Sequence, residues 1–165
     1  MNLPQFRIKI LNLDTTPDLD GEFFDPEGVA LCPDKVPVCY DFDRDVPERV
    51  WGNASLEKTA DGVYANIELH DPPTWPDAAI LLPDMYPSVG GSTLAAEPNA
   101  NGTRKITKCY ISMVGLHTGP NKDLRIKRIG DQLNEVNAQV IAGNDPAESL
   151  HSSITDDPFI QRTRK

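Results

Sequence analysis

The chain has 165 residues, of which 39% are hydrophobic, and a formal charge of −9 at pH 7. This length and apolar content predict one soluble domain with a hydrophobic core, and no apolar run is long enough to span a membrane. The acidic balance argues against a nucleic-acid-binding surface, because phosphate contacts require clustered Lys and Arg.

The three cysteines, Cys32, Cys39 and Cys109, match no zinc or redox spacing. They predict reduced, packed thiols in an intracellular setting, and no cofactor. Residues 1–14 lack the continuous apolar segment and the cleavage site of a signal peptide. We expect a first strand there.

Period-two patterns predict strands over much of the chain. Apolar residues alternate in residues 5–13, short β-rich runs follow at 28–32 and 36–40, and a further strand covers 104–116 with Cys109, Ile111 and Met113 on one face. Residues 50–59 and 63–70 form a hairpin joined through Asp61 and Gly62, because Asp-Gly is a strong turn signal. Residues 94–103 are predicted to be a loop from their Pro, Asn and Gly content.

Helical patterns are fewer. Residues 77–82 predict a short helix that Pro83 stops. A second, amphipathic helix follows residue 124, with an apolar stripe and a glycine stop: Ile129, Leu133, Val136, Val140 and Gly143. The predicted fold class is therefore α+β, a mainly antiparallel sheet or barrel with this helix packed against it. Residues 1–143 form the domain, and residues 144–165 form a short helix and a flexible or partner-ordered arm.

An acidic stretch at residues 16–27 nearly matches a calcium loop, with Asp18, Asp20 and Glu27 at its third, fifth and twelfth positions. The first position is Thr16, which is no carboxylate, and Pro26 obstructs the helix that should leave the loop. A solvated turn is therefore the preferred interpretation, and no metal is expected.

Serine catalysis needs a hydroxyl, a base within hydrogen-bond reach and a group that orients the base. The chain has three histidines, His70, His117 and His151. None lies near a recognisable nucleophile motif in the sequence. Each is therefore predicted to be a surface or loop histidine.

Four segments occur in an order typical of a known family: residues 36–43 (VPVCYDFD), 50–69 (VWGNASLEKTADGVYANIEL), 85–91 (MYPSVGG) and 105–121 (KITKCYISMVGLHTGPN). Their succession resembles the serine proteases that process the proheads of tailed phages. That superfamily includes the Mu-type head protease and is related to herpesvirus assemblin. The resemblance covers about residues 20–125 and implies a prohead-protease-like fold.

The resemblance also implies a site. Ser88 takes the position of the nucleophile, Ser112 matches a serine of the final strand, and Tyr110 takes the position of the third catalytic member. Phe42 stands at the position of the catalytic histidine. Because a phenyl ring accepts no proton, Ser88 is expected to be a poor nucleophile and the site to be vestigial.

The acidic residues around Phe42, Asp41, Asp43 and Asp45, are expected to be solvated loop charges. Asp41 and Asp43 flank Phe42, but in a strand their side chains would point away from it. A carboxylate is also a weak base for an alcohol. These residues are therefore not expected to replace the histidine.

The resemblance thus implies a catalytically inactive structural protein of a phage head, a capsid decoration or minor capsid protein that binds the shell. Its partner would be the major capsid protein or scaffold, and its location the virion, after assembly in the host cytoplasm. A homo-oligomer on the capsid is consistent with the symmetry of such particles. Two alternatives stay open: an active prohead maturation serine endopeptidase that cleaves scaffold or major capsid protein, and an assembly or scaffold-binding adaptor.

Overall fold

The computed structural model describes residues 5–71 and 73–141. Contacts divide the chain into two units, Met1–Ile129 and Gly130–Lys165, and each is described by itself. The predicted C-terminal helix and arm, with His151, lie outside the described residues. No helix in the described ranges is long and apolar enough to cross a membrane.

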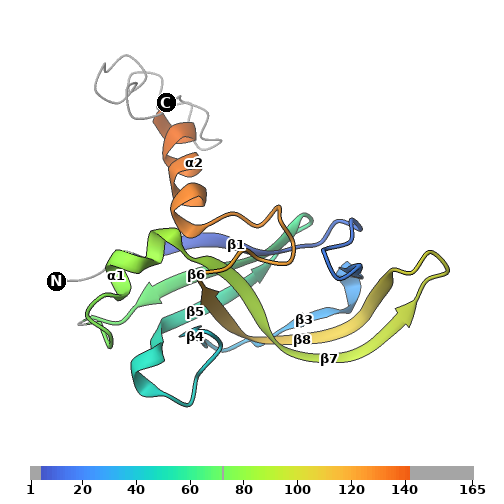
Figure 1. Ribbon diagram of the computed structural model, residues 1–165, viewed down its shortest axis with the longest axis horizontal. Coiled ribbons are helices and arrows are strands. Elements are labelled where there is room, and N and C mark those ends of the chain that lie inside the picture. The colour runs from blue at the N-terminus through green and yellow to red at the C-terminus, as the bar shows by residue number, and fades with distance from the viewer. Residues whose placement is uncertain (1–4, 72, 142–165) are drawn as a thin grey trace. The chain divides into compact units, whose positions relative to one another are not determined.

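The first unit is built on a curled, half-barrel sheet (Figure 1). Its strands are β1 (Phe6–Asn12), β2 (Glu22–Phe24), β3 (Val29–Leu31), β4 (Val36–Tyr40), β5 (Val50–Lys58), β6 (Gly62–Leu69), β7 (Tyr86–Pro98) and β8 (Arg104–His117). Among these eight strands the order is β1-β6-β5-β4-β8-β2, while β3 and β7 also pair with β8. The predicted α+β class is confirmed.

Strand β8 organises the sheet because its length allows it to pair with several strands. Three short strands, β2, β3 and β4, run parallel to it one after another and contact its residues 104–106, 109–111 and 114–116. Strand β7 pairs with β8 in the antiparallel sense. The pairs β1–β6, β5–β6 and β4–β5 are antiparallel as well, so the sheet is mixed rather than purely antiparallel.

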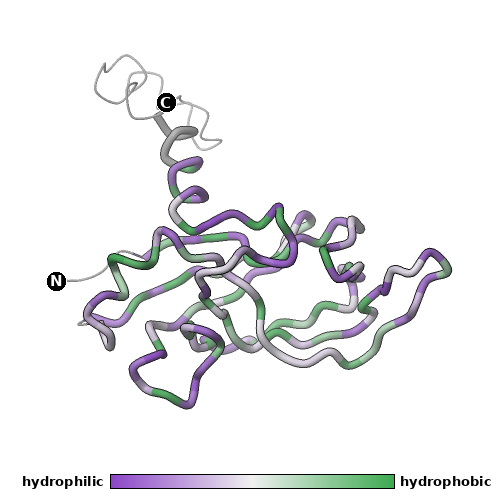
Figure 2. The backbone as a smooth tube through the Cα atoms, in the orientation of Figure 1, coloured by the Kyte–Doolittle hydropathy of each residue, from purple (hydrophilic) through white to green (hydrophobic). Residues whose placement is uncertain are grey.

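The predicted hairpin of β5 and β6 is confirmed, and its alternation builds the core. Val63, Ala65, Ile67 and Leu69 are buried, whereas the residues between them are partly or fully exposed. Figure 2 shows the same pattern along the sheet, with polar stretches concentrated in the connections. The largest fully buried side chain is Trp51 of β5, which stacks on Tyr40.

The predicted loop at residues 94–103 is wrong in its first half, because β7 continues to Pro98 and only residues 99–103 form the turn. Among the described strands, β7 pairs only with β8, and Pro98 is its last residue. At such an edge position the missing N–H of proline removes no hydrogen bond between strands. The predicted common face holds for Cys109 and Ile111, which are both buried, but not for Met113. Ser112 has no partner in β7, and after this bulge Val114 and Leu116 are the buried residues.

The helices are short. Helix α1 (Ala78–Leu81) follows Asp77 as predicted, and Pro83 lies in the 3₁₀ turn η3 (Leu82–Asp84) that continues it. Two further 3₁₀ turns, η1 (Pro26–Gly28) and η2 (Pro47–Arg49), each begin at a proline. Helix α2 (Ile129–Ile141) confirms the second predicted helix.

The β5–β6 turn makes the fold sensitive to acid. Hydrogen bonds from Thr59, Lys9 and Tyr64 hold the pKa of Asp61 well below its ordinary value of 3.8. A carboxyl whose pKa is depressed by folding stabilises the native state above its unfolded pKa, and that stabilisation is lost as pH falls. We therefore expect Asp61→Asn to lower Tm at pH 7, with a difference from wild type that shrinks as pH falls below about 4. A difference that stays constant from pH 7 to pH 3 in thermal melts would contradict this role.

Candidate functional site

Ser88 and His117 come from neighbouring strands and lie close together. Ser88 of β7 is opposite Gly115 of β8, and His117 lies two residues further along β8. Side chains two residues apart on a strand share one face, so His117 is a diagonal neighbour of Ser88. The Ser88 Oγ and His117 Nε2 atoms are 2.7 Å apart. His117, predicted to be a surface or loop histidine, is instead the last residue of β8 and is hydrogen-bonded to Ser88.

Asn121 fixes the direction of the hydrogen bonds around Ser88. The backbone N–H of Asp123 donates to Asn121 Oδ1 at 2.8 Å, so the Asn121 amide nitrogen faces the other way. It donates to the carbonyl oxygen of Pro87 at 2.7 Å and to Ser88 Oγ at 2.9 Å. Asn121 is the one buried polar side chain among the residues that the structure describes. Its burial is accounted for by these bonds.

These bonds also determine the tautomer of His117. Because Ser88 Oγ accepts from Asn121, its own proton is free to point at His117 Nε2. The carbonyl oxygen of Gly119 can only accept, so His117 Nδ1, 2.7 Å away, carries the proton. The neutral ring therefore presents the lone pair of Nε2 to the Ser88 hydroxyl. This is the arrangement that a general base requires.

Phe42 covers the same site. Its ring stacks on that of His117 with 6.2 Å between centroids and 21° between planes. Gly115 and Gly90 make room for the ring, since a Cβ atom at either position would press against it. Phe42 lies in a turn after β4, not in a strand as predicted, and Asp41 and Phe42 have positive φ angles of 52° and 60°. A bulky residue in this region carries strain of about 1–3 kcal/mol, so the fold holds Phe42 over His117 at a cost.

The other residues that the resemblance implied lie elsewhere. Tyr110 is opposite Ser92 in the β7–β8 register and Ser112 lies in the bulge. In the described chain, the hydrogen bonds of the Ser88 side chain go to His117 and Asn121 and not to these two residues. Of the acidic residues near Phe42, Asp41 and Asp45 are exposed and Asp43 lies 3.7 Å from Arg49.

A lysine contacts the acidic stretch that nearly matches a calcium loop. Lys122 Nζ lies 3.0 Å from Glu22, 3.5 Å from Asp20 and 3.6 Å from Asp18. Burial raises the pKa of Glu22, but hydrogen bonds from Arg104 and Lys122 outweigh it and lower the pKa overall. Glu27 lies apart in η1. Within the described ranges, no three His, Cys, Asp or Glu residues are arranged to hold a metal ion.

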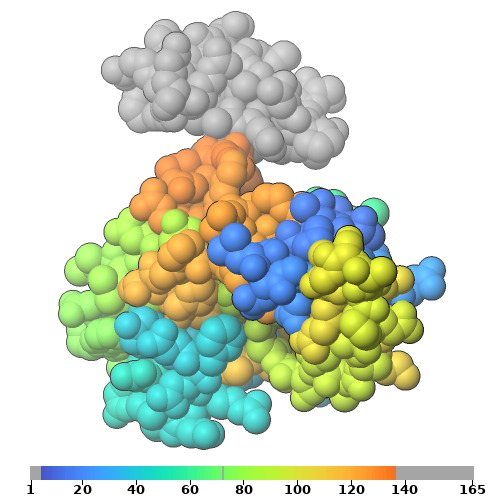
Figure 3. Space-filling model, turned by 45° about the vertical axis from the view of Figure 1, so that its right-hand side comes forward, coloured from blue at the N-terminus to red at the C-terminus, as the bar shows by residue number. Residues whose placement is uncertain are grey.

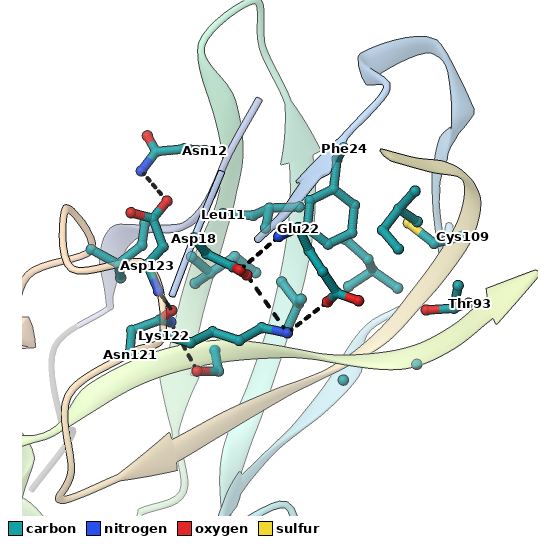
Figure 4. Close-up of a pocket in the computed structure, with 18 of the residues that line it drawn as sticks. Leu11, Asn12, Asp18, Glu22, Phe24, Thr93, Cys109, Asn121, Lys122 and Asp123 are labelled. Atoms are coloured by element: carbon teal, nitrogen blue, oxygen red, sulfur yellow. Dashed lines mark hydrogen bonds and ion pairs between the residues drawn. The ribbon is translucent and has the colours of Figure 1, made fainter. Parts of the chain in front are cut away.

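A cavity of about 400 Å³ opens beside Ser88. Residues of β1, β2, β7 and β8 line it together with the loop at 121–126, which lies against the N-terminal segment through a hydrogen bond from Leu19 N to the carbonyl oxygen of Lys122. Figure 3 shows these orange and blue segments side by side, next to the yellow end of the β7–β8 hairpin. In Figure 4 the Lys122 side chain extends across the cavity toward Asp18 and Glu22. Ser88 is therefore next to a space that can receive a ligand.

The sequence indicated Ser88 as a candidate nucleophile. It did not indicate His117 as the partner of Ser88, because strand β7 was not predicted. Gly90, Gly91 and two prolines interrupt the pattern of that segment. Once 86–98 is known to pair with 104–117 across a short turn, the register brings Ser88 and His117 together. The signal was the histidine at the end of the predicted strand 104–116.

Comparisons with models of protein families, with curated proteins and with solved structures find no match. The prohead-protease resemblance therefore rests on the motifs quoted above.

Proposed function

We propose that the protein is a serine endopeptidase of the prohead-maturation type, which cleaves scaffold or major capsid protein. The observation that supports this proposal is the 2.7 Å hydrogen bond between Ser88 Oγ and His117 Nε2. The other ring nitrogen of His117, Nδ1, donates to the carbonyl oxygen of Gly119. The phage setting and the polypeptide substrate come from the sequence resemblance. The proposed serine chemistry is inferred from the hydrogen bonds of His117 to Ser88 and Gly119.

In this mechanism, Ser88 Oγ attacks the carbonyl carbon of the scissile bond while its proton moves to His117 Nε2. That proton then passes to the leaving amine as the C–N bond breaks. Water hydrolyses the acyl-enzyme by the same two transfers, and Ser88 regains its proton. The carbonyl of Gly119 orients the ring through Nδ1–H, but it carries no charge to stabilise the imidazolium. We therefore expect slower turnover than from an enzyme in which a carboxylate accepts the Nδ1–H hydrogen bond of the histidine.

A second candidate is the catalytically inactive decoration or minor capsid protein. One observation favours it: Phe42 stands where the resemblance calls for the catalytic histidine, and its ring covers His117. In this alternative the Ser88–His117 pair is structural, and the protein acts through its surface on the capsid shell. A defined copy number in mature particles, with scaffold processed as in wild type in a Ser88→Ala phage, would favour this role.

The test of the leading proposal is cleavage. Purified protein is incubated with a pooled peptide library, and new termini are identified by mass spectrometry, with Ser88→Ala as the control. We expect the wild-type protein to cleave library peptides and the Ser88→Ala variant not to cleave them. Equal product patterns from the two proteins would overturn it. Cleavage of non-peptide esters alone would identify a different hydrolase.

Asn121 provides a separate prediction. In Asn121→Asp the carboxylate cannot donate to Ser88 Oγ and instead competes with His117 for the serine proton. We expect phosphonylation of Ser88 by a fluorophosphonate to slow by about tenfold or more, the scale of losing one hydrogen bond that involves a charged group. Asn99→Asp, in the β7–β8 turn, is the matched control. Equal labelling rates for all three proteins would show that Asn121 has only a packing role.

A further inference from the structure

The cavity beside Ser88 is too long for one side chain. Residues 88–93 of β7 all line it, and five steps along a strand span about 16 Å. Its volume of about 400 Å³ falls in the range of about 300–1,000 Å³ that is typical of ligand sites. The cavity therefore fits a short stretch of chain that begins at the scissile bond.

The lining of the cavity is mixed, and about half of its residues are apolar. Side chains of β1, β2 and β8 contribute much of the apolar part: Ile10, Leu11, Phe23, Phe24, Ile106 and Ile111. Burying apolar groups against such walls is favourable, at about 25 cal/mol per Å² of apolar surface. The walls thus favour aliphatic or aromatic side chains.

The charged residues of the lining already have partners. Asp18 accepts from the backbone N–H groups of Asp20 and Glu22, and Lys122 contacts both Asp18 and Glu22. Glu22 is also paired with Arg104. A charged ligand group would have to break one of these pairs or stay unpaired in a half-buried site, and either is costly.

At the other end of the cavity, Asp123 is satisfied in the same way. Its carboxylate accepts from Asn12 Nδ2 at 2.9 Å and from Arg125 Nε at 3.0 Å. Each charged residue of the lining, Asp18, Glu22, Lys122 and Asp123, thus has a partner within the protein. A charged substrate group would have to compete with these partners.

We propose that this cavity binds an uncharged, apolar stretch of two or more substrate residues on one side of the bond that Ser88 attacks. The inference rests on the proposed function for its substrate, but the binding site is argued from the cavity and its paired charges. The expected specificity is for apolar sequences rather than acidic or basic ones.

The test combines specificity with binding. Peptides that vary at three positions on each side of the scissile bond are compared by kcat/KM, with apolar residues expected to be favoured by about tenfold or more over Lys and Glu at two adjacent positions. Thr93→Trp, at the far end of the cavity, should remove the preference at the outer position and keep the inner one. Thr107→Trp, on β8 outside the lining, should change neither.

Binding is measured without catalysis in Ser88→Ala. A leucine-phenylalanine-leucine tripeptide should shift the amide NMR signals of Val89, Ser92 and Thr93, whereas glutamate and lysine tripeptides should not. Binding without cleavage by wild type would support the cavity and reject the endopeptidase. Cleavage with equal or greater preference for charged residues would reject the apolar site and keep the enzyme. Absence of tripeptide binding would overturn the inference directly.

Discussion

Replacing His117 by Gln is expected to lower kcat/KM for peptide hydrolysis by about 10³–10⁴-fold, the scale at which loss of a base disables a serine hydrolase. A glutamine side chain can accept a hydrogen bond from Ser88 but cannot take up its proton. The loss should fall on kcat, because His117 acts on the serine and not on the cavity. Steady-state kinetics on the best library peptide measures both parameters.

His70→Gln is the matched control for this variant. His70 follows β6, it does not line the cavity, and the side-chain hydrogen bonds of Ser88 go to His117 and Asn121 instead. Wild-type kinetics are expected for it. A His117→Gln enzyme with more than about a tenth of wild-type kcat would show that another group removes the proton.

Gly91→Ala is expected to destabilise the fold by about 3 kcal/mol or more, from the combined cost of overpacking and backbone strain. A Cβ atom at Gly91 would overlap the carbonyl oxygen of Tyr110, and its φ of +155° is unfavourable for alanine. The β7–β8 register shifts between Gly90 and Gly91, so the backbones approach each other there. Urea unfolding at constant m-value measures the change.

Gly102→Ala separates strain from overlap in the same hairpin. Gly102 has a φ of +86°, but a Cβ atom there would have no heavy atom within 4 Å. The loss of stability in Gly102→Ala should come only from the positive φ angle and amount to about 1 kcal/mol. Equal destabilisation by the two variants would mean that the close approach at Gly91 has no role in stability.

Local patterns were enough to predict the elements whose faces differ in polarity. The β5–β6 hairpin has an Asp-Gly turn, and β6 alternates without interruption, so both strands were predicted correctly. Strand β7 lacks that alternation. Its glycines are required by the partner strand rather than by a turn, and that requirement is visible only once the pair is formed.

The site shows the same limit. The resemblance made Ser88 a candidate nucleophile, but its contact with His117 arises from a register that depends on β7 and on the bulge at Ser112. Lys122 contacts Glu22 of the acidic loop, about 100 residues away in the sequence. No local spacing predicts such a contact. The left-handed turn at Asp41 and Phe42 contains no glycine, and the sequence accordingly favoured an extended strand there.

Phe42 has a different meaning in the structure from the one it had in the sequence. The resemblance made it the residue whose presence removes the base. In the fold, its ring stacks on His117, a histidine of another strand that is hydrogen-bonded to Ser88. Whether that pair reacts is the question on which both candidate functions depend.

A fluorophosphonate probe answers it most directly. Wild-type protein is treated with the probe, digested and analysed by mass spectrometry, in parallel with the His117→Gln variant. The account predicts stoichiometric phosphonylation of Ser88 in the wild type and a rate reduced by about 10³-fold or more in the variant. A wild-type Ser88 that stays unmodified under conditions that label a serine protease to completion would contradict it.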